Sequence, residues 1–168
     1  MSRESILAAA ESDLGLAEYP PRSNRIKYND WYYEGTVINA AWCATAVSYW
    51  YFFGGHPLPR IDSEQGFAYV PTMYYYAKKN NLFTDKPEPV DIVIYDFNGD
   101  GKWDHTGLFE KWSLEGKSFW AIEGNTTPQR YIRDRSLDTE ANGGEVCRMS
   151  RTYNPSKIKF IKFETLFQ

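Results

Sequence analysis

The chain has 168 residues, 42% of them hydrophobic and 17% aromatic, which supplies one domain with a sizeable core and argues against disorder. Its formal net charge of -3 gives no broad basic field, so non-specific nucleic-acid binding is not expected as its main task. Segment 1–11 is interrupted by charges and lacks a long apolar run, so it matches neither a secretory signal nor a membrane span. We therefore expect cytoplasmic synthesis without a signal peptide, and no membrane partner.

Helices are predicted in the first half of the chain. Apolar residues at helical spacing favour a helix over 5–14 and an apolar helix over about 42–53. Pro71 suits the first turn of a further helix that runs through Lys79. Segment 23–33 is polar and aromatic, and is predicted to be an ordered loop with a short helix.

The second half changes to short segments rich in β-branched and aromatic residues, separated by turn-forming residues. The predicted strands are 90–95, 106–112, 118–123, 130–133, 145–150 and 157–163. Helices first and strands second indicate an α+β fold, in which N-terminal helices pack on an antiparallel sheet. We expect a single domain over 1–163. Segment 164–168 looks like the remnant of a viral 3C-protease cleavage site left by a cloning vector, with a native terminus as the alternative, and is set aside.

Cys43 stands at the start of the second long helix, within Ala-Trp-Cys-Ala. Unpaired N–H groups and the positive dipole end of a helix favour a thiolate over a thiol there, which suggests a nucleophile. The competing interpretation is a buried small hydrophobe. The second cysteine, Cys147, is expected in the core. A disulfide between the two is not expected, because it would remove the nucleophile.

His105, Glu123 and Asn125 follow Cys43 in the order that a cysteine hydrolase needs: a base, then an acid or amide that orients the base. A turn near 115–116 would pair the strand that begins at His105 with the strand that ends at Glu123, bringing the two side chains together. His105 alone could be a structural strand histidine. Whether Glu123 or Asn125 orients it stays open at this point.

Short motifs follow one another along the chain, at 17–20 with 23–24 and Tyr28, then at 42–44, 90–95, 104–107 and 123–126. This ordered set resembles the CHAP domain, the cysteine- and histidine-dependent amidohydrolase/peptidase family with a papain-like fold. The resemblance covers nearly the whole chain. It implies that Cys43 is the nucleophile, His105 the base, Glu123 the orienting acid and Asn125 a second polar member of the site. It also implies an attack on peptidoglycan, at the amide between muramic acid and L-alanine or in the stems and cross-bridges.

Upstream polar and aromatic residues are candidates for contacts with substrate. The Cys43 N–H would hold the oxyanion together with Asn24 or Tyr28. A groove for glycan or peptide could be lined by Tyr28, Trp31, Trp42 and Trp103, although all four aromatics could equally be core residues.

An acidic loop precedes the histidine. Asp96, Asn98, Asp100 and Asp104, with a glycine at the sixth position, match the first part of a calcium loop, so bound Ca²⁺ is predicted. Gly107 replaces the glutamate expected at the twelfth position, so the loop is not a complete EF-hand. The alternative is an ordinary hairpin loop that uses Asn-Gly and Asp-Gly. No organic cofactor is expected.

Taken together, the sequence predicts a monomeric hydrolase whose partner is bacterial peptidoglycan and which acts on the wall after release from the cell. A phage lysin, an interbacterial toxin with an immunity protein as partner, and an autolysin all fit. The alternatives are a cysteine amidase or peptidase with a non-wall substrate, and a non-catalytic wall-binding module.

Overall fold

The computed structural model describes residues 2–36, 39–128 and 144–167. The four α-helices of this part all lie in its N-terminal half: α1 (Arg3–Ser12), α2 (Lys27–Tyr32), α3 (Cys43–Phe53) and α4 (Val70–Lys79). The strands follow: β1 (Phe83–Thr84), β2 (Ile92–Tyr95), β3 (His105–Leu114), β4 (Ser118–Thr126), β5 (Glu145–Thr152) and β6 (Ile158–Ile161). The predicted α+β class, with helices before strands, is confirmed.

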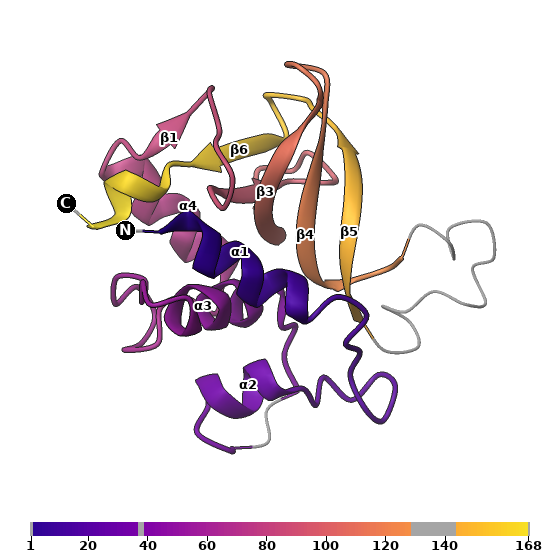
Figure 1. Cartoon of the computed structure of the whole chain (residues 1–168). Helices are drawn as coiled ribbons and strands as arrows, with labels where there is room; N and C mark the ends of the chain where they lie inside the picture. The colour runs from indigo at the N-terminus through magenta and orange to yellow at the C-terminus, as the bar shows by residue number, and fades with distance from the viewer. Residues whose placement is uncertain (1, 37–38, 129–143, 168) are drawn as a thin grey trace.

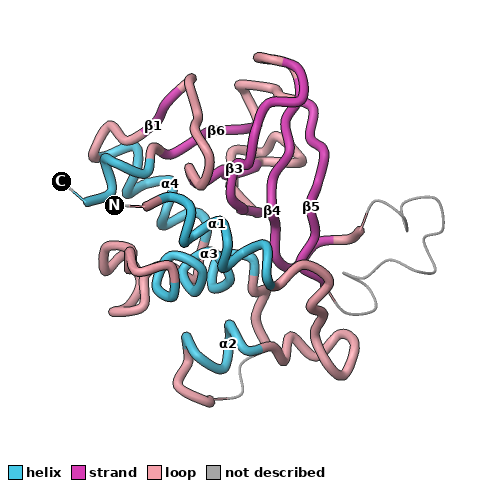
Figure 2. The backbone as a smooth tube through the Cα atoms, viewed as in Figure 1, coloured by secondary structure: helices cyan, strands magenta, loops and turns pink. Residues whose placement is uncertain are grey.

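The strands form one six-stranded antiparallel sheet in the order β1-β6-β2-β3-β4-β5. Helices α1, α3 and α4 gather beside the sheet, whereas α2 lies beyond α3, away from the strands (Figure 1). A long loop joins α1 to α2 (Figure 2). The hairpin of β3 and β4, which places His105 and Glu123 on neighbouring strands, is as predicted.

Two differences from the predicted elements have simple causes. The two-residue strand β1, which pairs with β6, is too short to show any alternation in the sequence. Helix α1 begins at Arg3, two positions before the apolar pattern becomes visible. The strand predicted at 130–133 falls outside the described residues.

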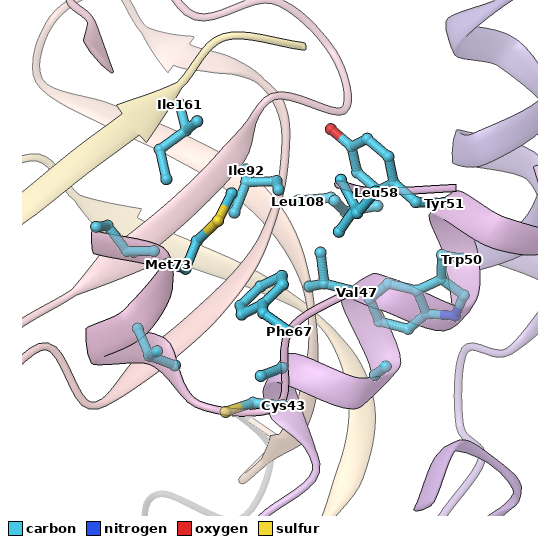
Figure 3. Packing of buried hydrophobic residues seen from close by; sticks show 14 of the residues in the cluster. Cys43, Val47, Trp50, Tyr51, Leu58, Phe67, Met73, Ile92, Leu108 and Ile161 are labelled. Atoms are coloured by element: carbon cyan, nitrogen blue, oxygen red, sulfur yellow. The ribbon is translucent and has the colours of Figure 1, made fainter. Parts of the chain in front are cut away.

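The main hydrophobic core fills the space between the helices and one face of the sheet. Val47 and Trp50 of α3 meet Ile92 of β2 and Leu108 of β3 there, and all four side chains have no solvent exposure (Figure 3). A smaller cluster, which includes Tyr95 and Phe109, occupies the other face. Buried side chains therefore lie on both faces of the sheet.

The C-terminal segment packs on the domain. Phe163–Phe167 forms a 3-10 helix in which Leu166 is only 3% exposed. Glu164 accepts a hydrogen bond of 3.0 Å from Arg3 Nε, and the two termini lie near each other (Figure 1). Residues 164–167, which the sequence did not assign to the domain, thus pack against it.

The structure also bears on the two cysteines and on membrane-spanning helices. Cys43 and Cys147 are both buried and are not joined by a disulfide, as predicted. None of the helices in the described residues has the length and apolar character that crossing a bilayer requires.

Candidate active site

Cys43 is the first residue of α3, and its neighbour Trp42 at the N-cap makes no side-chain capping hydrogen bond. The N–H groups of the first helical turn are therefore not used by a capping side chain, which suits them to bind an anion. Cys43 is 5% exposed and lies where the helix start meets the core (Figure 3). Helix α3 packs against β3 and β4, the two strands that carry the other candidate residues.

His105 connects the cysteine with an acid. Its Nε2 lies 2.8 Å from Oε2 of Glu123. Cys43 interacts electrostatically with the same imidazole and lines the same cavity, and since Nε2 faces Glu123, Nδ1 is the nitrogen left for the sulfur. His105 is 5% exposed and Glu123 has no exposure, so the contact between them is shielded from water. The predicted juxtaposition of His105 and Glu123 is confirmed.

The surroundings favour a protonated imidazole. Burial lowers the pKa of His105, but the hydrogen bonds and charges of Cys43 and Glu123 outweigh it and raise that pKa to about 10. Because the folded-state pKa is raised, the stabilisation from this pairing is complete below the ordinary value of 6.5 and is lost as the pH rises toward 10. An imidazolium next to a thiolate is the proton arrangement that cysteine nucleophiles use.

Glu123 has two further partners that the sequence analysis missed. Tyr95 donates its hydroxyl to Oε1 at 2.7 Å, and Arg151 Nε donates to the same oxygen at 2.9 Å. Both lie 28 positions from Glu123, in segments whose residue types signal only strands. No local motif could have indicated them.

Two glycines make the approach of these elements possible. A side chain at Gly107 on β3 would place Cβ 2.6 Å from Cγ of Glu123 and 2.7 Å from the carbonyl oxygen of Ile122. A side chain at Gly124 on β4 would meet the ring of Trp42 at 2.8 Å. The glycines of Asp-His-Thr-Gly and Glu-Gly-Asn therefore leave room for Glu123 beside His105 and bring β4 against the start of α3.

An open cavity of about 430 Å³ lies over the thiol. Cys43, His105, Asn24 and Asn125 all line it, together with Phe97 and Asp104 among others. Asn125 has a positive φ of 51°, a conformation that asparagine tolerates better than most residues. In this arrangement Glu123 contacts the imidazole directly, and Asn125 lies at the cavity instead.

Two of the predicted substrate contacts lie elsewhere, which corrects their assignment. Tyr28 is fully buried and donates its hydroxyl to Oδ2 of Asp13 at 2.8 Å. Trp42 is also fully buried, and its ring stacks on Tyr28 with centroids 5.4 Å apart. Apolar aromatic area outweighed the polar tips of these side chains, so both belong to the core.

Of the remaining aromatic candidates, Trp103 lies beside Cys43 and Trp31 does not line the cavity over the thiol. Trp31 packs against Tyr49 of α3 with ring centroids 5.5 Å apart, and it is not among the residues that line the cavity over the thiol. Trp103 is 6% exposed and stacks on Tyr74 at 4.9 Å. Trp103 also lines a second hollow of about 310 Å³ that includes Cys43, so one aromatic wall adjoins the thiol.

The acidic loop between β2 and β3 is organised by Asp96. Its carboxylate is 3% exposed and accepts hydrogen bonds from the N–H groups of Gly99, Asp100 and Gly101 at 2.8, 3.2 and 2.9 Å. Burial and the nearby charge of Asp96 raise the pKa of Asp104. In the described parts of the chain, no three of the acidic, histidine and cysteine side chains are grouped as a metal site. Calcium binding by this loop stays a prediction.

Comparison with known proteins adds no family to this geometry: no family model matches the chain, and no curated protein matches it.

The proton arrangement can be tested by NMR titration of the two histidines in the chain. We expect the pKa of His105 above the ordinary 6.5 in the native protein and a lower pKa in Glu123→Gln, because the amide carries no negative charge. The variant His56→Ala identifies the second signal and should leave the His105 titration unchanged. An unshifted His105 in both proteins would contradict the pairing.

The role of Gly107 as a spacer predicts that Gly107→Ala is disproportionately harmful. The added methyl has to displace Glu123 or the strand, at a cost of about 1–3 kcal/mol of stability. Thermal unfolding should show the loss, and the His105 pKa should fall as Glu123 moves away. Gly116→Asn is the control, since nothing lies within 4 Å of a Cβ at that turn.

For the acidic loop, we expect millimolar calcium to raise the melting temperature and a chelator to lower it, because a ligand of the folded state stabilises that state. Asp100→Ala should weaken both responses, whereas Asp85→Ala, outside the loop, should not. Isothermal titration of chelator-treated protein measures binding directly. No heat and no melting shift would identify the loop as a hairpin held by Asp96 alone.

Proposed function

We propose that this chain is a cysteine-dependent hydrolase that cleaves an amide bond of bacterial peptidoglycan, on a papain-like CHAP fold. One observation carries the chemistry: the cysteine at an uncapped helix start and a histidine line one cavity, and Nε2 of that histidine contacts a buried carboxylate. The nucleophile helix packed on an antiparallel sheet supports the fold. The sequence resemblance to the CHAP domain supports the substrate.

The reaction would proceed in two steps. The sulfur of Cys43 attacks the scissile carbonyl carbon, and the carbonyl oxygen becomes an oxyanion that the Cys43 backbone N–H can hold. Asn24, on the wall of the same cavity, is the candidate for the second donor. As the C–N bond breaks, His105 gives its proton to the leaving amine and an acyl-enzyme remains.

The second step returns the enzyme to its starting state. His105, now neutral, takes a proton from water as the hydroxide adds to the thioester. The adduct then expels the sulfur as thiolate, which restores the thiolate–imidazolium pair, and the carboxylic acid product leaves and gives its proton to solvent. Glu123 holds Nε2 throughout and so fixes the imidazole orientation. Asn125 faces the cavity, where its amide suits a contact with substrate.

The substitution of Cys43 tests the proposal on purified wall sacculi. We expect Cys43→Ala and His105→Ala to lower release of wall fragments by a factor of about a thousand or more, because the reaction loses its nucleophile or its base. Glu123→Gln and Asn125→Ala should give smaller losses. Cys147→Ala and His56→Ala are matched controls and should retain activity.

The products discriminate among the alternatives. New amino termini or released stem peptides, identified by mass spectrometry, support hydrolysis and name the bond. Sedimentation of the protein with sacculi without any release would instead favour a wall-binding module. Inactivity on sacculi combined with cleavage of a glutathionylspermidine-type or protein amide would indicate a substrate other than the wall. Full activity of Cys43→Ala would remove the assignment of the nucleophile.

A further inference from the structure

The carboxylate of Glu123 is shared among three side chains. His105 Nε2 contacts Oε2, Tyr95 donates to Oε1, and Arg151 reaches both oxygens through Nε and Nη2, at 2.9 and 2.5 Å. Glu123 has no solvent exposure, and the Arg151 side chain is 21% exposed. The arginine thus bonds both oxygens of the acid, in the two-pronged geometry that fixes a carboxylate plane.

The four residues come from four adjacent strands. Tyr95 is on β2, His105 on β3, Glu123 on β4 and Arg151 on β5, which are neighbours in that order. Strands β3, β4 and β5 run side by side in Figure 1. The position of the carboxylate is therefore set by the sheet, which is more rigid than a loop.

Aromatic rings hold Arg151 in turn. Its guanidinium carbon lies 4.9 Å from the ring centroid of Phe97 and 5.3 Å from that of Tyr95, both within the range of cation–π attraction. Phe97 also stacks on His105 with centroids 5.5 Å apart and is itself 49% exposed. One ring thus contacts the arginine and the histidine at once.

The charge of Arg151 has a definite effect on Glu123. Burial alone raises the pKa of a carboxylic acid, because the charged form loses its hydration. Here the charges and hydrogen bonds of Arg151 and His105 outweigh burial and lower the pKa of Glu123 to about 2. Two further titratable groups interact with His105: Cys43 from α3, and Asp104, which immediately precedes β3.

We propose that Arg151 is a positioning residue of the Cys43–His105 site, which keeps Glu123 ionised and aimed at His105 Nε2. This inference rests on the proposed cysteine hydrolase. Without Arg151, the buried acid would take up a proton at higher pH, and a neutral acid would no longer hold the imidazolium beside the thiolate of Cys43. The reactive form of Cys43 would then be lost at a higher pH than in the native protein as the solution is acidified.

The test is site-resolved alkylation of Cys43 by iodoacetamide as a function of pH, read by mass spectrometry. In the native protein the rate of labelling should fall as the pH is lowered, and we call this fall the acid limb. We expect the acid limb to move up by about one to three pH units in Arg151→Met, the range that loss of an adjacent opposite charge gives. The matched control is Arg148→Met on the same strand. Arg148 bonds Glu11 and Glu110 instead, so its limb should coincide with that of the native protein.

Two more variants show whether Arg151 acts through Glu123. Adding Arg151→Met to Glu123→Gln should move the limb no further than Glu123→Gln alone. Arg151→Lys keeps the charge but lacks the fork, so it should shift the limb in the same direction by a smaller amount. The lysine variant also provides the test if Arg151→Met melts below the assay temperature.

The proposal is overturned if folded Arg151→Met and Arg148→Met label alike, if Arg151→Lys shows no shift, or if the shift persists undiminished in the Glu123→Gln background. Labelling of the thiol does not depend on the wall. A shifted limb in a protein that releases nothing from sacculi would therefore reject the proposed substrate while retaining the role of Arg151.

Discussion

The carboxylate of Glu123 has no contact with solvent, and a buried charge of this kind persists only where opposite charges and hydrogen-bond donors replace water. Arg151, Tyr95 and His105 supply those replacements from three separate strands. Removing one partner leaves the charge under-compensated, so the strands around it are energetically coupled. The network that orients the histidine is thereby also a constraint on the packing of the sheet.

The site also depends on the space that two glycines leave between its elements. Gly107 leaves the space that Glu123 occupies, and Gly124 lets β4 approach Trp42 at the start of α3. Cys43 at the helix start and His105 then line the same cavity. Since close-packed interiors yield little, a methyl group at either glycine has to move an element that carries part of the site.

The sequence was informative where a local pattern has a local cause. Apolar periodicity located α3. Segments rich in β-branched and aromatic residues, with a turn near 115–116, located the β3–β4 hairpin and with it the proximity of His105 to Glu123. It could not identify Arg151, whose relation to Glu123 depends on the pairing of β4 with β5 and on a long side chain reaching along the sheet. It also left Tyr28 and Trp42 open, because amphipathic aromatics suit a groove and a core equally well, and only burial separates the two.

The acidic loop has a mechanical link to the histidine that does not depend on whether it binds a cation. Asp96 gathers three backbone N–H groups, and the N–H of Asp104 returns to the carbonyl of Tyr95, so both ends of the loop are fixed to β2. Phe97 is carried by this loop and stacks on His105 and Tyr95. A change in the loop that moves Phe97 would uncover the imidazole and one face of the guanidinium of Arg151. Water there would weaken the attraction between Arg151 and Glu123, since charges interact less strongly at higher dielectric. The loop is therefore placed to influence the histidine through the packing of one ring.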